Sequence, residues 1–153
     1  MSLSLHASLE ELSTISHGRL IIQGEEGWIV LQSYAKPQQA LCEVASNTYL
    51  PESHHLDSSK EEYAQQHGFS WRRNNRTLGK IVAIATADQR QILTSELTSI
   101  FTTLYNQSIE HAHLHIQTNI LSGIQNRSLC HTMRQLSMKR THELRLEVYR
   151  AFL

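Results

Sequence analysis

Residues 19–34 read R-L-I-I-Q-G-E-E-G-W-I-V-L-Q-S-Y, and this stretch decides the fold class. Its two apolar runs, 19–23 and 28–34, are short and rich in β-branched and aromatic residues, as strands are. Gly24 and Gly27 bound the segment between them, since glycine adopts positive φ without steric cost. So short a connection joins antiparallel neighbours, and the sequence therefore predicts a β-hairpin.

Working outward from this hairpin, a turn at residues 35–38 leads to a third predicted strand at 39–47, which makes a meander. The other expected elements are a helix carrying Leu5, Leu9 and Leu12, a short helix from about residue 57 to 67, strands at 69–73 and 80–85, and a helix ending at Tyr105. Residues 107–125 fit two structures, because their apolar positions have helical spacing while 111–116 also alternates with period two.

These patterns predict an α+β domain, with a twisted, mainly antiparallel sheet of about five strands and helices packed on one face. We expect residues 1–153 to form one domain, made of an α+β core at 1–106 and a C-terminal helical extension at 107–153. An apolar content of 40% with 18% charged residues is typical of globular chains. No apolar run approaches the roughly 18 residues that span a bilayer. With no signal-peptide pattern and only two cysteines, we expect a cytoplasmic chain that binds no membrane.

Residues 46–69 carry a resemblance to a known family. The segment Ser46-Asn47-Thr48-Tyr49-Leu50-Pro51 follows a predicted strand, and His67-Gly68-Phe69 ends the short helix after it. Over residues 15–106 the chain resembles the YbjN-like and type III secretion chaperone-like peptide-binding domains of bacteria. The resemblance implies a sheet with helices on one face, the other face being free for a client or a second copy. It implies neither catalytic residues nor a cofactor.

The residue pattern suggests a binding surface for a protein or peptide client. Trp28, Val30 and Tyr34 alternate along one predicted strand, where they either grip a partner or lie buried under the helices. Trp71, Arg72 and Arg73 form the second half of the predicted partner-binding set. The alternative is a nucleic-acid-associated regulatory protein that uses the basic C-terminal helix and a basic hairpin, with one stacking aromatic among Arg72, Arg73, Arg76 and Lys80. A solvated edge hairpin would also explain these charges.

His111, His113 and His115 are the most chemically suggestive residues. On a strand their imidazoles would share one face at intervals of about 6.6 Å, which suits one or two ligands to a metal but seldom three. The sequence shows no nucleophile elbow, no cysteine-nucleophile signature and no phosphate-binding loop. We therefore expect no enzyme activity, no cofactor and no metal.

The C-terminal segment differs in charge from the rest of the chain. Residues 1–106 hold 8 Lys and Arg against 11 Asp and Glu, a net of −3, and residues 107–153 hold 6 against 3, a net of +3. Composition predicts a helix over 126–152, with one apolar stripe at Leu144, Val148 and Phe152. We expect this stripe to form a homodimer interface, the alternative being that the helix folds back on its own sheet.

Overall fold

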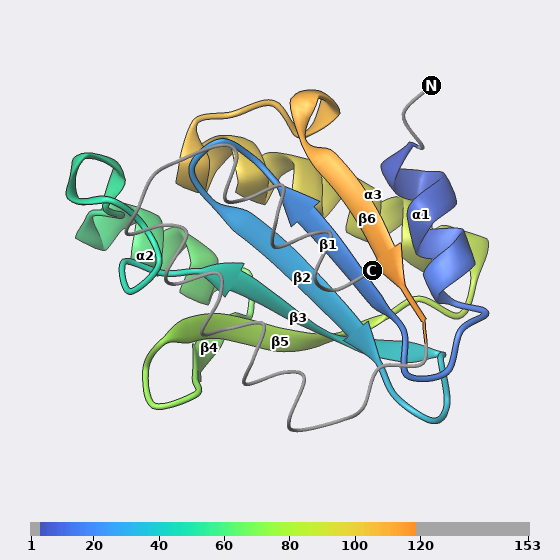
Figure 1. Ribbon diagram of the computed structural model, residues 1–153. Helices are drawn as coiled ribbons and strands as arrows, with labels where there is room; N and C mark the ends of the chain where they lie inside the picture. Colours follow the sequence, from blue (N-terminus) through green and yellow to red (C-terminus); the bar gives the residue numbers. More distant parts are fainter. Residues whose placement is uncertain (1–3, 119–153) are drawn as a thin grey trace.

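The computed structural model describes residues 4–118, and they form an α+β unit (Figure 1). The three α-helices are α1 (Leu5–Leu12), α2 (Ser58–Gln66) and α3 (Ala87–Tyr105). The six strands are β1 (Arg19–Gln23), β2 (Trp28–Ser33), β3 (Gln39–Ala45), β4 (Ser70–Arg72), β5 (Thr77–Ala83) and β6 (His113–Gln117). Two short 3₁₀ turns, η1 (Glu52–His54) and η2 (Ile109–His111), complete the described elements. The predicted fold class is confirmed.

All the paired strands form one antiparallel sheet in the order β4-β5-β3-β2-β1-β6. The strand β6 comes from the segment that fitted either helix or strand, and it lies beside β1 with Ile116 opposite Leu20. The sheet therefore has six strands rather than about five, and it continues past residue 106. The predicted helix at 126–152, with Leu144, Val148 and Phe152, lies outside the described residues.

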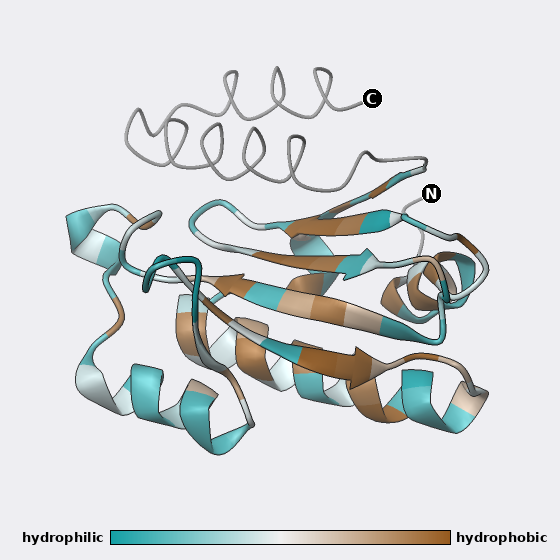
Figure 2. Ribbon diagram, turned by 90° about the horizontal axis from the view of Figure 1, so that it is seen from below, coloured by the Kyte–Doolittle hydropathy of each residue, from teal (hydrophilic) through white to brown (hydrophobic). Residues whose placement is uncertain are grey.

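The described helices lie on one side of the sheet (Figure 2). The longest of them, α3, buries a stripe of apolar side chains, as its 3.6-residue spacing predicts. The buried apolar residues of this stripe are Leu93, Leu97, Ile100, Phe101 and Leu104. The helix α1 buries Leu5, Leu9 and Leu12 in the same core. Among residues 4–118, no helix is long and apolar enough to span a bilayer.

Local capping sets where the helices begin and end. The helix α3 starts with a capping box, in which Thr86 accepts from the Gln89 backbone N–H at 3.1 Å. It ends at Asn106, whose φ of 53° is left-handed. Gly68, with a φ of 89°, stops the chain after α2. These sequence-level stop signals therefore act as predicted.

The segment Ser46–Pro51 is a structural turn. Tyr49 and Leu50 are buried, with 1% and 6% of their surfaces exposed. The Tyr49 ring meets Trp28 edge to face, with a centroid separation of 5.2 Å. The Ser46 hydroxyl donates to the Arg76 carbonyl, which ties this turn to the start of β5. β5 begins at Thr77, three residues before the predicted start, because Thr77 and Leu78 pair with Ala45 and Val44 of β3.

Candidate functional site

The register of the strands divides the sheet into two faces, since directly opposed residues of neighbouring strands point to the same side. The helix-packed face, which is turned toward α3, carries Leu20, Ile22, Ile29, Leu31, Cys42, Val44, Leu78, Lys80 and Val82. The face turned away from α3 is called here the distal face. Its residues, strand by strand from β6 to β4, are His113, His115, Gln117; Arg19, Ile21, Gln23; Trp28, Val30, Gln32; Gln39, Leu41, Glu43, Ala45; Thr77, Gly79, Ile81, Ala83; Ser70, Arg72.

The predicted aromatic grip does not form a continuous exposed surface. Trp28 and Val30 share the distal face as predicted, but they are buried, with 3% and 7% exposure. Tyr34 follows the end of β2 and is 41% exposed. Trp28 and Tyr34 therefore belong to opposite ends of β2, and Trp28 is engaged with Tyr49.

The second predicted set is also divided. Trp71 lies opposite Leu78 on the helix-packed face and is half-buried against the core, whereas Arg72 is exposed on the distal face. Arg73 donates to both Glu43 carboxylate oxygens, at 2.7 and 2.8 Å. Thr77 donates to the same carboxylate at 2.6 Å. Arg73 is thus part of a structural hydrogen-bonded cluster on the distal face.

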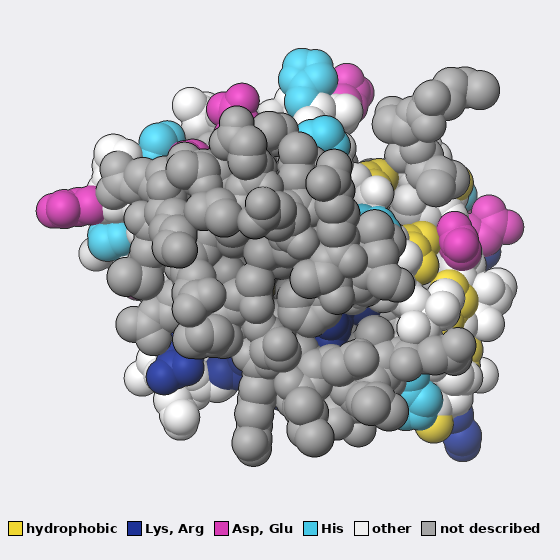
Figure 3. Space-filling view, viewed as in Figure 1, with side chains coloured by type: hydrophobic (Ala, Val, Ile, Leu, Met, Phe, Trp, Pro, Cys, Tyr) yellow, Lys and Arg dark blue, Asp and Glu magenta, His cyan; other side chains and the backbone are white. Residues whose placement is uncertain are grey.

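The basic residues proposed for nucleic acid do not form one surface. Lys80 pairs with Glu96 of α3 and donates to the His67 carbonyl at 2.6 Å, so both it and Arg73 are neutralised locally. In the view of Figure 3, the charged side chains that are visible among the described residues are of both signs. Within residues 4–118, the ion pairs of Arg73 and Lys80 leave these two side chains less available for phosphate contacts.

The described structure instead has an unpaired edge on β5. The strand β4 opposes only Thr77, Leu78 and Gly79, so residues 80–83 have no described strand beside them on that side. The Ile84 N–H points toward β3 and donates to the carbonyl of Gln38, the residue just before β3, at 2.9 Å. Because peptide groups alternate along an antiparallel strand, those of Val82 also face β3, while those of Ile81 and Ala83 face outward.

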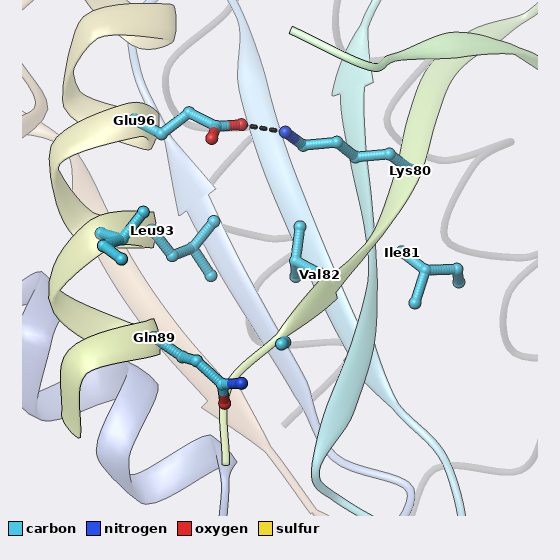
Figure 4. A pocket seen from close by; sticks show the side chains of 8 residues that line it. Lys80, Ile81, Val82, Gln89, Leu93 and Glu96 are labelled. Carbon is cyan, nitrogen blue, oxygen red and sulfur yellow. Dashed lines mark hydrogen bonds and ion pairs between the residues drawn. The ribbon is translucent and has the colours of Figure 1, made fainter. Parts of the chain in front are cut away.

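Beside this edge lies a groove of about 230 Å³ between β5 and α3 (Figure 4). The strand contributes Lys80 to Ala83, and the helix contributes Gln89, Ile92, Leu93 and Glu96. Figure 4 shows Val82 and Leu93 facing each other in the middle, with the Lys80–Glu96 pair beyond them at one end and Gln89 at the other. The groove therefore has an apolar middle and polar ends.

Two large apolar side chains near this edge face solvent, Ile92 on α3 beside the groove and Ile81 on the distal face of β5. Ile81 is 53% exposed and Ile92 is 67% exposed. We call residues 80–83 together with the groove the β5 edge site. Sequence analysis missed it, because the run K-I-V-A-I-A at 80–85 identified a strand but not its place at an edge. Strand order depends on pairing between distant segments, which a local pattern does not encode.

The described residues offer little for catalysis. The Cys42 thiol is fully buried, and burial raises its pKa, so it stays protonated and unreactive at neutral pH. His113 and His115 share the distal face of β6, but His111 belongs to η2, outside the strand. Within residues 4–118, no group of three His, Cys, Asp or Glu side chains is placed to hold a metal ion.

A second cavity, of about 370 Å³, lies between the start of α1, the middle of α3 and the segment that enters β6. Its lining mixes apolar residues such as Leu5 and Ile109 with His6 and Glu110. The α3 residues on its wall, Thr94 and Thr98, donate their hydroxyl protons to carbonyls one turn earlier in the helix. These two hydroxyl protons are therefore already used within the helix.

No family model, no curated protein and no solved structure matches this chain.

Proposed function

We propose that this chain is a non-catalytic protein- or peptide-binding domain with a chaperone- or adaptor-like role. The observation that carries the proposal is the β5 edge site. It combines outward-facing peptide groups at Ile81 and Ala83 with the exposed side chains of Ile81 and Ile92.

Free sheet edges are usually blunted, because they also template unwanted pairing between chains. Charged side chains, prolines and bulges are the common ways to prevent such pairing. Within β5 there is one charged side chain, Lys80, and it is already paired with Glu96. A free edge flanked by exposed isoleucines is therefore suited to a protein partner.

The proposal is tested by selecting a random heptapeptide library, displayed on phage, against the full chain. Enriched peptides are then synthesised with a fluorophore, and their binding is measured by fluorescence anisotropy. We expect Ile92→Glu to weaken binding about tenfold or more, because it places a charge on the rim of an apolar groove. Ser99→Glu is the matched control, since it adds the same charge at an exposed α3 position that does not line the groove.

Failure to enrich any peptide over the bare support contradicts the proposal, as does binding that Ile92→Glu leaves unchanged. Salt dependence distinguishes the nucleic-acid alternative. Binding to an apolar groove changes little between low and high salt, whereas phosphate contacts weaken steeply.

We also propose that the chain belongs to the YbjN-like or type III secretion chaperone-like domains and acts in the cytoplasm. The order of elements supports the family assignment: three strands of a meander, the turn at 46–51, a short helix, two further strands and a long helix. The buried Tyr49 and the left-handed Gly68 lie in the segment that carries the resemblance.

The proposed homodimer rests on the sequence pattern at Leu144, Val148 and Phe152, outside the described residues. Light scattering of the full chain at micromolar concentrations tests it. A monomeric mass contradicts the dimer, and a dimeric mass that Val148→Glu abolishes supports it.

A further inference from the structure

We infer that the partner of the β5 edge site is an extended segment of another protein, which adds to β5 as a strand and places one apolar side chain in the groove beside α3. This inference rests on the proposed function and specifies how the site would be used.

The backbone of β5 limits which partner structure can bind. Outward N–H and C=O groups at Ile81 and Ala83 are complemented by the peptide groups of another extended chain. A helix has already used its own peptide groups internally, so it would leave those of β5 without partners. At about 3.4 Å per residue, the added strand would pair over residues 80–83, a length of roughly 14 Å.

The strand β4 fixes where the added strand ends. Ser70 already opposes Gly79, and Gly68 joins the end of α2 to the start of β4 at this point. The Lys80 ammonium lies 4.9 Å from the centre of the Phe69 ring and donates to the His67 carbonyl, so this corner is occupied. The partner segment must therefore stop beside Lys80 and extend in the other direction, past Ala83.

The groove determines which side chain the partner supplies. A partner residue opposite Val82 points to the helix-packed face and so toward Leu93. A volume of about 230 Å³ lies below the roughly 300–1,000 Å³ of small-molecule pockets, so it suits a single aliphatic or aromatic side chain. The partner residues on either side of it point to the distal face, where the exposed Ile81 favours β-branched neighbours.

A second copy of this chain fits the edge less well. Symmetric antiparallel pairing of two β5 strands centred on Ile81 would put Ala83 of the second copy opposite Gly79. Ser70 already holds that place. A segment without its own neighbouring strand avoids the clash of this register, so we assign the site to a peptide of another protein, and pairing with a second copy is an outcome that the test distinguishes.

The test uses the synthetic peptide with the highest affinity from the library selection. Ala83→Pro removes one outward N–H and leaves the inward peptide groups of Val82 and Ile84 in place, and proline is tolerated at such edge positions. We expect it to weaken peptide binding about three- to tenfold, the value of one backbone hydrogen bond. Ala83→Val changes the side chain at the same position but keeps the N–H, so binding should fall less with it than with Ala83→Pro.

Amide hydrogen exchange on the wild-type chain provides a second readout that needs no variant. Without peptide, the Ile81 and Ala83 amides should exchange faster than the inward Val82 amide, and saturating peptide should slow both at least about tenfold. If Ala83→Pro fails to fold, this measurement decides alone.

The possible failures are distinguishable. If no peptide binds the wild type, the proposed function is wrong. If a peptide binds but neither Ala83→Pro nor amide exchange responds, peptide binding stands and strand addition is wrong. If the Ile81 and Ala83 amides are protected without peptide, the edge is already occupied by the chain itself or by a second copy, and the inference is overturned.

Discussion

The two faces of the sheet carry side chains of different chemistry, although the same strands contribute to both faces. On the helix-packed face, the central positions of β1, β2 and β3 are apolar, as at Leu20, Leu31 and Val44. On the distal face, charged and amide side chains stand among the apolar ones. Its buried polar members are Arg19, Gln23, Gln32, Glu43, Thr77 and Gln117.

This difference shows which interactions specify each face. Apolar burial is non-directional and grows with area, so the helix-packed face is stabilised by close packing against α1 and α3. A buried charge is tolerated only with directed partners. Glu43 has Arg73 and Thr77, and fully buried Arg19 donates to Gln117 at 3.3 Å. The distal face should therefore be more sensitive to charge and pH, and less sensitive to lost volume.

The largest expected effect is at the apolar corner of the distal face. Tyr49→Ala should cost about 3–5 kcal/mol of unfolding free energy, the usual range for truncating a buried aromatic. It removes the ring that contacts Trp28 and leaves a cavity beside it. Tyr34→Ala is the matched control and should change the stability by less than about 0.5 kcal/mol, because Tyr34 is exposed. A loss below about 1 kcal/mol for Tyr49→Ala in a denaturant titration would contradict this packing.

The helix-packed face gives the next effect. Leu31→Ala should cost about 2–5 kcal/mol, because the fully buried Leu31 side chain fills a position that its neighbours cannot collapse into. Ile92→Ala removes a similar volume from an exposed site and should stay within about 0.5 kcal/mol of the wild type. Similar losses of unfolding free energy for the two variants would contradict the burial of Leu31 on the helix-packed face.

The Glu43 cluster provides the third test. Glu43→Gln keeps the shape but removes the charge, so it should cost about 1–2 kcal/mol, discounted because the Arg73 side chain is 29% exposed. A double-mutant cycle with Arg73→Gln should give a coupling energy of about 0.5–1.5 kcal/mol, measured by urea unfolding. A coupling energy indistinguishable from zero would mean that the pair does not stabilise the distal face.

Local patterns predicted the elements better than their arrangement. The hairpin at 19–34 and the end of α3 at Tyr105 follow from residues close in sequence, and both are present. The strand β6 could not be assigned, because His111 to Ile116 satisfies both periods and only pairing with β1 decides between them.

The site was less predictable for the same reason. Alternation placed Trp28 and Val30 correctly on one face, but their burial depends on segments distant in sequence, such as Tyr49. Ile81 and Ile92 have no distinguishing local pattern. Their exposure follows from β4 being only three residues long, which leaves the rest of β5 without a neighbour on that side among the described residues.

The smallest expected effect compares two histidines on the distal face of β6. Burial lowers the pKa of His115 below its ordinary value of 6.5, because desolvation disfavours the imidazolium. The unfolded chain then binds a proton more readily than the folded chain, so stability is fully present above pH 6.5 and falls as the pH drops through the lower folded pKa. His115→Gln should make the loss of thermal stability between about pH 7 and pH 5 less steep. The control is His113→Gln, the same substitution at an exposed position of the same strand face, and both variants are compared with the wild type in melts followed by circular dichroism. If His115→Gln melts with the wild-type pH dependence, the distal face tolerates a charged imidazole there, and its sensitivity to charge is confined to the Glu43 cluster.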